Sequence, residues 1–481
     1  MPRIAFPADL HVSGMEHMVN DMVSVLGPAF RKLPRPLLVA EPCYGIGAFR
    51  ELMMQIQEEY VSKYAYDQDA RLEQWHKNLA VQDGKVPSKT GHFGAIKGDI
   101  RFVKLSDLKD VDALVAGAQG PPWAVARRAG VQDLRAEVFL TVRKWLVELG
   151  GRGSLKFFCV EASNYTTGTR GYNTRLLHMC GGADSFIDDL TQKLPEFHIS
   201  KDNIQLENFI PHQRERCLVR GIRWDILKAA GLSSIPKPIS AFEHGPVPLA
   251  QILDWDADNI LPLGQFSDKK RENLTMYEAA IHADCADGLV GPQSIAAFDL
   301  CKPFVANRSG LVFYDRVPSL NPRGQVLDII LASVGDIEEP MVTRTSRLLL
   351  RPLTLGERFL LCGHPARRAK LGSKSATVSL TGTACPVPMM AAAVAPLVVA
   401  LGNSGLVVAS EMGQVSCPCP CPCPCRISDS EMGQVAQVAS QIQKKTTRPS
   451  TEDNAVDKKR RLLPPTAHDR QRRRRARSAE W

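Results

Sequence analysis

The sequence predicts an α/β protein whose mainly parallel sheet is covered by helices on both faces. Residues 37–40 have the character of a short buried strand, which leads through a glycine turn into a helix from Phe49 to about Tyr60. Further apolar runs then alternate with helical stretches as far as residue 222. Because parallel strands need crossover connections, this alternation indicates a sheet built from strand–helix units.

The other elements of this region follow in chain order. A second strand is predicted over residues 63–66 and ends at Asp67, and a helix follows over 70–78. The later elements are a strand at 112–116, a helix at 138–149, and strands at 156–160 and 216–222.

The sequence pattern changes after Trp224. Residues 235–262 are proline-rich and irregular, 271–282 suit a helix, and 311–334 suit short strands broken by proline and glycine. These features predict a second, smaller domain.

Composition places the chain among soluble globular proteins. It has 481 residues, of which 44% are hydrophobic and 23% charged, so a wholly disordered or fibrous chain is excluded. The apolar stretch 385–409 contains three prolines and two glycines, which favours a buried helix and strand over a membrane span. The start, Met1–Leu10, has no charged region followed by a long apolar one, so no signal peptide is expected.

Most of the net charge of +9 comes from the end of the chain, because residues 441–481 carry 13 Lys and Arg against 5 Asp and Glu. Before this basic tail, the hexapeptide 410–415 recurs at 430–435, with alternating cysteine and proline between the copies. We expect an extended, low-complexity segment here. The basic clusters suit nuclear import or nucleic-acid binding, and simple solvated charge is the alternative.

Thirteen cysteines indicate reduced thiols in an intracellular compartment. Five of them belong to the cysteine–proline run, and the other eight include no C-x-x-C pair. This spacing argues against a disulfide framework or a zinc site, and no metal is expected in the folded part. Metal capture by the five clustered thiols stays open.

Three segments suit a nucleotide-like cofactor. Tyr44-Gly45-Ile46-Gly47 is the glycine turn, and Asp67 follows a predicted strand at a distance where a carboxylate accepts both ribose hydroxyls. In Gly98-Asp99-Ile100, an acid and an apolar residue suit an adenine amino group and its ring. Each segment alone has an ordinary alternative, a ligand-free turn or a surface aspartate.

The order of these and later segments resembles the motif series of the cytosine-5 DNA methyltransferases. The resemblance covers about residues 36–400, with a gap over the variable 225–340 region. The later matching segments are 116–123 (AGAQGPPW), 160–163 (VEAS), 211–216 (PHQRER), 355–365 (LGERFLLCGHP) and 381–388 (TGTACPVP).

The resemblance implies a role for each matching residue. The turn Tyr44–Gly47 would cradle the methionine part of S-adenosylmethionine, Asp67 would hold its ribose, and Asp99 and Ile100 would contact its adenine. Gly382 and Thr383 match a pair that closes over the cofactor. Glu161 would hydrogen-bond the target cytosine, while Arg214 and Arg216 would position the active-site loop and the base.

The implied fold is a Rossmann-like S-adenosylmethionine-dependent methyltransferase with a mixed sheet, an inserted target-recognition domain and a disordered basic tail. The implied partner is double-stranded DNA with a flipped cytosine, in a nuclear or other intracellular setting, with no membrane. RNA stays open as a substrate, and the oligomeric state is not specified. The expected divisions are an N-terminal extension (1–35), a cofactor domain (36–234), the recognition insert (235–342), the completion of the cofactor domain (343–402) and the tail (403–481).

The sequence departs from the family pattern where a cysteine nucleophile is expected. Counted from Gly117, the aligned position holds Gly120, and a shifted alignment puts Trp123 there; neither supplies a thiol. Cys159, on a predicted strand, is expected to be a buried core thiol. Three further polar positions of the family are altered, at Ala162, His212 and Thr383.

Three hypotheses follow. The first is a cytosine-5 methyltransferase, which needs a different nucleophile to be active and is otherwise impaired or inactive. The second is a catalytically dead homologue that binds cofactor, DNA or a partner enzyme. The third, an amino-group methyltransferase acting on adenine N6, is suggested by Gly120-Pro121-Pro122-Trp123, which lacks that motif's acidic residue.

Overall fold

The computed structural model describes residues 15–67, 69–82, 98–117, 136–162, 186–254, 266–290, 294–302, 312–320, 328–333 and 349–405. All of them belong to the first of two compact units of the chain, Met1–Gln414. The second unit, Val415–Trp481, lies outside the described residues.

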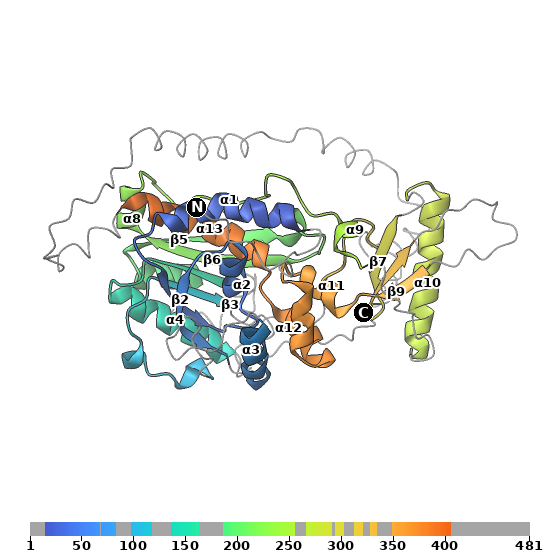
Figure 1. Ribbon diagram of the computed structural model, residues 1–481, viewed down its shortest axis with the longest axis horizontal. Helices are drawn as coiled ribbons and strands as arrows, with labels where there is room; N and C mark the ends of the chain where they lie inside the picture. Colours follow the sequence, from blue (N-terminus) through green and yellow to red (C-terminus); the bar gives the residue numbers. More distant parts are fainter. Residues whose placement is uncertain are drawn as a thin grey trace, which may run out of the picture. The chain divides into compact units, whose positions relative to one another are not determined.

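A six-stranded mixed sheet forms the centre of the described fold (Figure 1). Its spatial order is β2-β1-β3-β4-β6-β5, with the first four strands parallel and the last two antiparallel to their neighbours. The predicted α/β class with a mixed sheet is therefore confirmed. The strands are β1 (Leu37–Pro42), β2 (Tyr60–Tyr66), β3 (Ala113–Gly117), β4 (Phe157–Ala162), β5 (Phe197–Gln205) and β6 (Glu215–Arg223).

Separate apolar cores cover the two faces of this sheet, which is why the interior strands β1, β3 and β4 are mostly apolar. On β4, Phe157 and Cys159 enter one core, while Phe158 and Val160 enter the other. The prediction that Cys159 is a buried core thiol is confirmed. The helices of this region are α2 (Ala48–Gln55), α3 (Ala70–Gln82), α4 (Ala136–Gly151), α7 (Phe186–Lys193) and α8 (Trp224–Ala229).

The predicted helix after the glycine turn is too long. α2 ends at Gln55, whereas the sequence suggested about Tyr60. Gln57 has a φ of 58°, a left-handed conformation that breaks the helix. Tyr60 instead begins β2 and packs edge-on against Phe49 at 5.2 Å between ring centroids.

Helices from the two ends of the first unit pack together on one face of the sheet. α1 (Glu16–Arg31) lies along α13 (Val387–Ser404), which also contacts α2 and α8. The stretch Lys374–Ser404 is long and apolar enough to cross a membrane, but 89% of its most apolar window is buried in the fold. The predicted buried helix is confirmed, and the strand predicted beside it is wrong as far as Gly405, because α13 runs on to Ser404.

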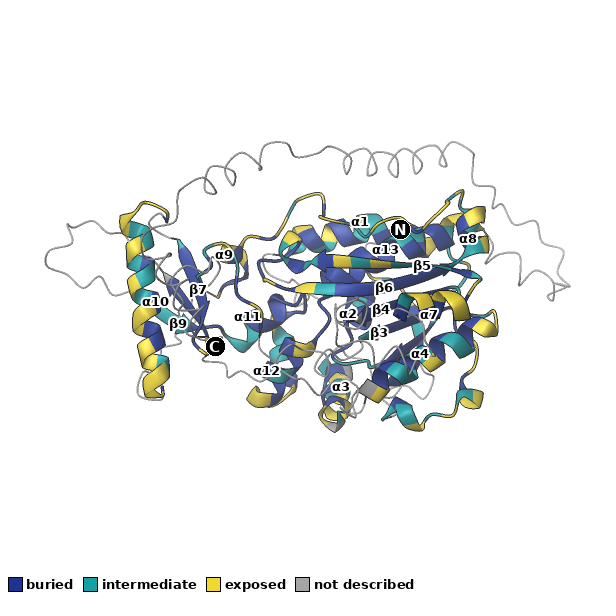
Figure 2. Cartoon of the chain, turned by 180° about the vertical axis from the view of Figure 1, so that it is seen from behind, coloured by how far each residue is buried: buried dark blue, intermediate teal, exposed yellow. Residues whose placement is uncertain are grey.

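A smaller antiparallel sheet lies beyond the large one, with α10 (Asp268–Ala286) packed against it through a core of its own (Figures 1 and 2). Its strands are β7 (Ile295–Asp299), β8 (Ile329–Ser333) and β9 (Leu349–Pro352). α10 contains the predicted helix 271–282, and β8 lies in the region predicted to hold short strands. The exact domain boundaries stay predictions.

Short helices connect the small sheet to α13. α9 (Leu249–Ile252) precedes α10, and α11 (Leu355–Leu360), η9 (Ala366–Leu371) and α12 (Lys374–Thr383) follow β9. α11 begins with a capping box, in which Thr354 and Glu357 bind each other's backbone amides. Buried Glu357 also pairs with Arg351 of β9 at 2.5 Å, which fixes α11 to the small sheet.

Candidate functional site

The predicted cofactor residues meet at the carboxyl edge of the parallel strands. The glycine turn follows β1, Asp67 follows β2, and Gly117 and Glu161 lie at the ends of β3 and β4. Gly45 and Gly47 have φ values of 56° and 76°, a left-handed conformation that glycine adopts without strain. This edge is where open α/β sheets hold their ligands.

Asp67 is hydrogen-bonded to the glycine turn. Its Oδ2 accepts from the amide of Gly45 at 2.9 Å, and its Oδ1 accepts from the amide of Asp69 at 2.9 Å. The side chain is buried, so both bonds hold the carboxylate in one orientation beside the turn. The structure thus brings these two predicted parts together, and the contact of Asp67 with a ribose stays a prediction.

His76 of α3 also contacts this turn. Its Nε2 lies 2.8 Å from the carbonyl oxygen of Gly45, and its ring lies 4.7 Å from that of Tyr44. Burial lowers the pKa of His76 to about 3, so the ring is neutral and Nε2 carries the donated proton. Sequence reasoning missed His76, because one histidine in a helix has no distinctive spacing.

Glu41, two residues before Cys43 and the turn, is a buried carboxyl group. Ser62 and Tyr60 of β2 donate hydrogen bonds to its Oε2. Burial raises the pKa of Glu41 to about 7 despite these bonds. The sequence analysis also missed this residue, since a glutamate at a strand end resembles an exposed one.

Asp99 and Ile100 open the short helix η2 (Ile100–Phe102). Asp99 accepts from the amide of Arg101 at 2.9 Å and pairs with its guanidinium at 2.6 Å, and this hydrogen bonding lowers the Asp99 pKa. Ile100 is buried. Burial, followed by the charges of Asp67 and Asp99, raises the pKa of Cys43.

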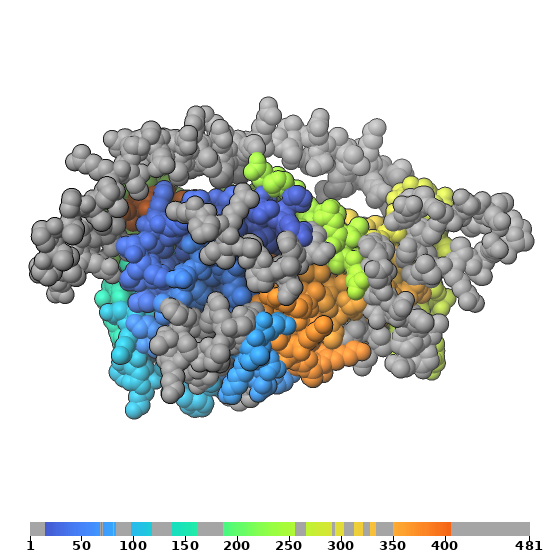
Figure 3. Space-filling model, viewed as in Figure 1, coloured from blue at the N-terminus to red at the C-terminus, as the bar shows by residue number. Residues whose placement is uncertain are grey.

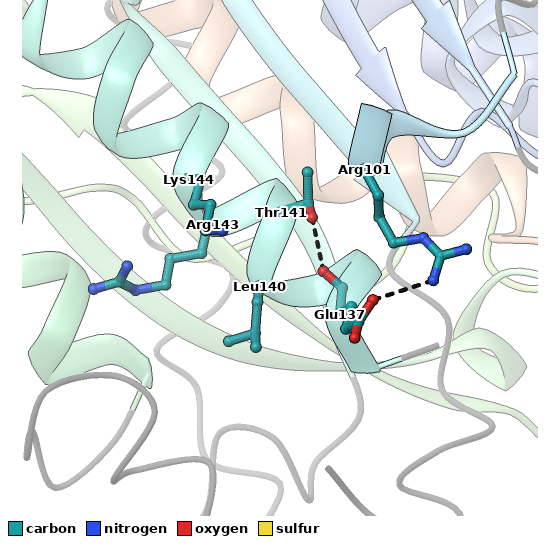
Figure 4. A pocket seen from close by; sticks show the side chains of 6 residues that line it. All are labelled: Arg101, Glu137, Leu140, Thr141, Arg143 and Lys144. Atoms are coloured by element: carbon teal, nitrogen blue, oxygen red, sulfur yellow. Dashed lines mark hydrogen bonds and ion pairs between the residues drawn. The ribbon is translucent and has the colours of Figure 1, made fainter. Parts of the chain in front are cut away.

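A surface pocket of about 410 Å³ lies next to η2 (Figure 4). It contains none of the predicted cofactor-binding residues, although Arg101 directly follows Ile100. In Figure 4, Arg101 reaches toward Glu137 at the start of α4, and the two form an ion pair at 3.2 Å. The lining residues are Arg101, Glu137, Leu140, Thr141, Arg143 and Lys144.

Glu161 and Arg216 form an ion pair at the end of β4. Glu161 Oε1 lies 2.5 Å from Arg216 Nε, and the Glu161 side chain is 9% exposed. A Cβ added to Gly117 would lie 3.7 Å from Glu161 Oε2 and 3.6 Å from the carbonyl oxygen of Cys43. The pair therefore borders both the glycine turn and the end of β3. Gly120 itself lies outside the described residues.

Arg214 is buried and holds the junction between α12 and α13. Its guanidinium donates to the carbonyl oxygens of Thr381, at 3.2 Å, and of Ala384. Burial lowers the pKa of Arg214 to about 10. The predicted residues Gly382 and Thr383 lie in this junction, where the Thr383 hydroxyl donates to the Ser379 carbonyl at 3.1 Å. In this structure Arg214 supports the backbone, and its contact with a base stays a prediction.

His212 lies three residues before β6 of the large sheet and is hydrogen-bonded to the backbone of two distant segments. Its Nδ1 donates to the Leu361 carbonyl at 2.8 Å, and its Nε2 accepts from the Leu320 amide at 3.2 Å. Burial holds the pKa of His212 well below its usual value, so the ring is neutral. The polar position that departs from the family pattern is thus satisfied by backbone groups on both sides.

Three thiols lie near the Glu161–Arg216 pair, and all are poorly suited to form thiolates. Burial raises the pKa of Cys159 to about 12 and also raises the pKa of Cys362 and of Cys385. The charge of Glu161 adds to the increase at Cys385. Since the thiolate is the reactive form, these cysteines are weak nucleophiles. In the part of the chain that the structure describes, no group of three His, Cys, Asp or Glu suits a metal ion.

No family model matches the chain, and no curated protein matches it. Among solved structures, the methyltransferase EhMeth of Entamoeba histolytica is 11% identical, with a TM-score of 0.43 over 76% of this chain and 98% of its own. The Dnmt2 methyltransferase of S. pombe is 12% identical, with a TM-score of 0.44 over 76% and 98%. A putative prophage DNA modification methyltransferase of E. coli is 12% identical, with a TM-score of 0.42 over 78% and 100%.

Proposed function

We propose that the chain binds S-adenosylmethionine and a nucleic acid at this edge of the sheet, and that it resembles a cytosine-5 methyltransferase without retaining full activity. The observation that carries the proposal is the convergence of the glycine turn, Asp67 and the Glu161–Arg216 pair at the ends of β1, β2 and β4. These are the groups that the motif order assigned to cofactor and base.

The residues present fit the cofactor. Glycines with positive φ let the turn approach a ligand closely, Asp67 is oriented by two amides, and buried Ile100 offers an apolar surface. Asp99 fits this role less well, because its carboxylate already binds Arg101. When bound, S-adenosylmethionine supplies an electrophilic methyl group. The chain's part is to orient it and to exclude water.

The Glu161–Arg216 pair suits the polar edge of a cytosine. Arg216 engages Oε1 of Glu161, while Oε2 faces the end of β3. A carboxyl group held in this way hydrogen-bonds the ring nitrogen and amino group of the base, and a nearby arginine adds positive charge at the carbonyl edge. Both residues come from β-strands, which gives the pair a rigid support.

The missing step is nucleophilic addition to the base. C6 of cytosine must accept a nucleophile before C5 attacks the methyl group, and glycine at position 120 offers no atom for this bond. The thiols near Glu161 are buried, with raised pKa values. We therefore propose a binding or regulatory homologue whose methyl transfer is greatly reduced or absent.

Covalent trapping tests the proposal, because 5-fluorocytosine holds the enzyme–base adduct. With S-adenosylmethionine present, the native chain is expected to form no adduct on DNA or RNA containing 5-fluorocytosine, whereas Gly120→Cys is expected to form one. The double variant Gly120→Cys/Glu161→Gln should lose most of that adduct. An adduct with the native chain would contradict the inactive reading. No adduct with Gly120→Cys on either nucleic acid would contradict the motif alignment.

Cofactor binding is tested separately by calorimetry. Asp67→Asn is expected to weaken S-adenosylmethionine binding about tenfold or more, because a charge-assisted hydrogen bond contributes roughly 1.5–3 kcal/mol. Asp110→Asn is the matched control, since this exposed aspartate lies away from the turn in the sequence. Equal affinity of the native chain and Asp67→Asn would show that Asp67 does not hold the ligand.

A further inference from the structure

A basic surface lies at the start of α12, away from the residues that the motifs single out. Lys370 and Lys374 are exposed, and Arg367 is half-buried beside them in η9. Between residues 358 and 405 the chain has no Asp or Glu, so no acid of the same stretch neutralises the two lysines. We call Lys370 and Lys374 the α12 basic surface.

Lys374 lies at the end of α12 where a cation is unfavourable. The N-terminus of a helix carries partial positive charge, which repels a cation and attracts an acid. α11 follows the ordinary pattern, with Glu357 in its first turn. α12 has no acid in its first turn and begins with Lys374. An anion from outside the chain would relieve this repulsion.

Two buried polar atoms near Gly372, in the short link between η9 and α12, have no hydrogen-bond partner. They are Nε1 of Trp75 and Oγ1 of Thr377. A Cβ added to Gly372 would lie 3.4 Å from Cδ1 of Trp75, the atom bonded to Nε1, and 3.7 Å from Oγ1 of Thr377. Both atoms can donate hydrogen bonds, and both lie next to the N-terminus of α12, where the Ser373 side chain accepts from the Ala376 amide and leaves the amides of Lys374 and Ser375 uncapped. This arrangement of donors is typical of an anion site.

The opposite end of α12 reaches the candidate active site. Arg214 binds the carbonyls of Thr381 and Ala384 there. Lys374 is nine residues before Thr383, which is about 14 Å along a helix. α12 and η9 adjoin α3 on the visible face of Figure 3, where Asn78 donates to the Leu371 carbonyl at 3.0 Å. A nucleic acid with its target base at Glu161 has backbone phosphates within this distance.

We propose that the α12 basic surface binds a backbone phosphate of the nucleic acid whose target base lies at Glu161. The inference rests on the proposed function and adds a contact outside the pocket. Lys370 and Lys374 would supply charge, and the first amides of α12, with Trp75 and Thr377 below them, would supply hydrogen bonds after a small movement of Gly372. These contacts read no base, so they add affinity and fix the position of the duplex.

Salt-dependent binding by the full chain tests this contact. Lys370→Gln/Lys374→Gln is expected to lower the slope of log affinity against log salt by about one, since a phosphate contact contributes about 0.9. Lys370→Arg/Lys374→Arg should keep the native slope. The matched control is Lys228→Gln/Lys237→Gln, two exposed lysines on and after α8, which lies away from α12 in Figures 1 and 2. The basic tail contributes equally to all four proteins.

Hydrogen exchange gives a local readout that the tail does not affect. Amides of residues 372–377 should exchange more slowly when duplex is added to the native chain, but not when it is added to the glutamine variant. Equal slopes and equal protection in both proteins would overturn the inference and leave the proposed function intact. Protection by inorganic phosphate but not by duplex would also overturn it. If the native chain binds neither DNA nor RNA, the proposed function itself fails.

Discussion

At the scale of single residues, the carboxyl groups around the glycine turn behave differently because their surroundings differ. Asp67 accepts two amide hydrogen bonds, Asp99 pairs with Arg101, and buried Glu41 accepts hydrogen bonds from the hydroxyls of Ser62 and Tyr60. The sequence indicated Asp67, because an acid after a strand is a recognisable pattern, and it indicated Asp99 through the Gly-Asp-Ile segment. It missed Glu41 and His76, whose importance comes from burial under residues distant in sequence.

Glu41→Gln is predicted to change how stability depends on pH. The pKa of Glu41 rises from 4.5 in the unfolded chain to about 7 in the folded one, so the folded state keeps a proton that the unfolded state loses. Native stability therefore decreases as pH rises through this window, by a total of roughly 3 kcal/mol. Glu41→Gln lacks this loss, so its free energy of unfolding should rise relative to that of the native chain as pH rises. Urea unfolding at several pH values across the window measures this difference.

Exposed Glu59 provides the control for that series, since Glu59→Gln should follow the native curve. If the free energies of unfolding of Glu41→Gln and the native chain differed by the same amount at every pH, the raised pKa of Glu41 would be contradicted.

At the scale of elements, the sequence predicted the interior strands well and the packing of remote helices poorly. The strands are apolar because both faces are buried, and this pattern is local. α1 was not predicted, because its amphipathic face is matched by α13, more than 350 residues later in the chain. β5 was also missed, since its residues are mostly polar or half-buried at the sheet edge.

Gly402→Ala is predicted to disturb the contact between α1 and α13. A Cβ at this position would lie 2.9 Å from the carbonyl oxygen of Ala29, a backbone atom that cannot rotate away. We expect a loss of about 1–3 kcal/mol in the free energy of unfolding, measured by urea denaturation. Gly151→Ala is the control, because its Cβ would meet nothing within 4 Å, and the change should stay within about 0.5 kcal/mol. Similar values for the two variants would show that α1 does not pack closely here.

At the scale of the whole molecule, the fold class could be predicted but the assembly of the site only in part. Motif order correctly indicated that the turn, Asp67 and Glu161 lie at one edge of the sheet. It did not indicate that Arg214 would bind helix carbonyls, or that His212 would bridge two backbone segments. Those contacts depend on three-dimensional packing between segments that have no shared pattern.

Acid is predicted to destabilise the molecule through its buried histidines. Burial lowers the pKa of His76 and of His364 to about 3, and that of His212 well below 6.5. Below about pH 6.5 the unfolded chain gains protons at these positions and the folded chain does not, so stability falls with pH. Three such groups give a slope approaching about 4 kcal/mol per pH unit, opposed by Glu41 over part of the range.

Urea midpoints measured from neutral to mildly acidic pH check this prediction. His17→Gln, a change at an exposed histidine, should keep the native slope, while His364→Asn should reduce it. A native midpoint that stays constant across the range would contradict the buried, neutral histidines.

The hydrogen bonds from Arg214 to the end of α12 have a consequence for folding during translation. Two guanidinium nitrogens of this arginine donate to carbonyl oxygens 167 and 170 residues further along the chain. In a nascent polypeptide that still lacks residues 381–384, the Arg214 guanidinium has no carbonyl partner, although strands β4, β5 and β6 can already pair. Ribosome-bound or prematurely terminated products should therefore remain protease-sensitive around β6, and resistance should arise only when the final helices have emerged.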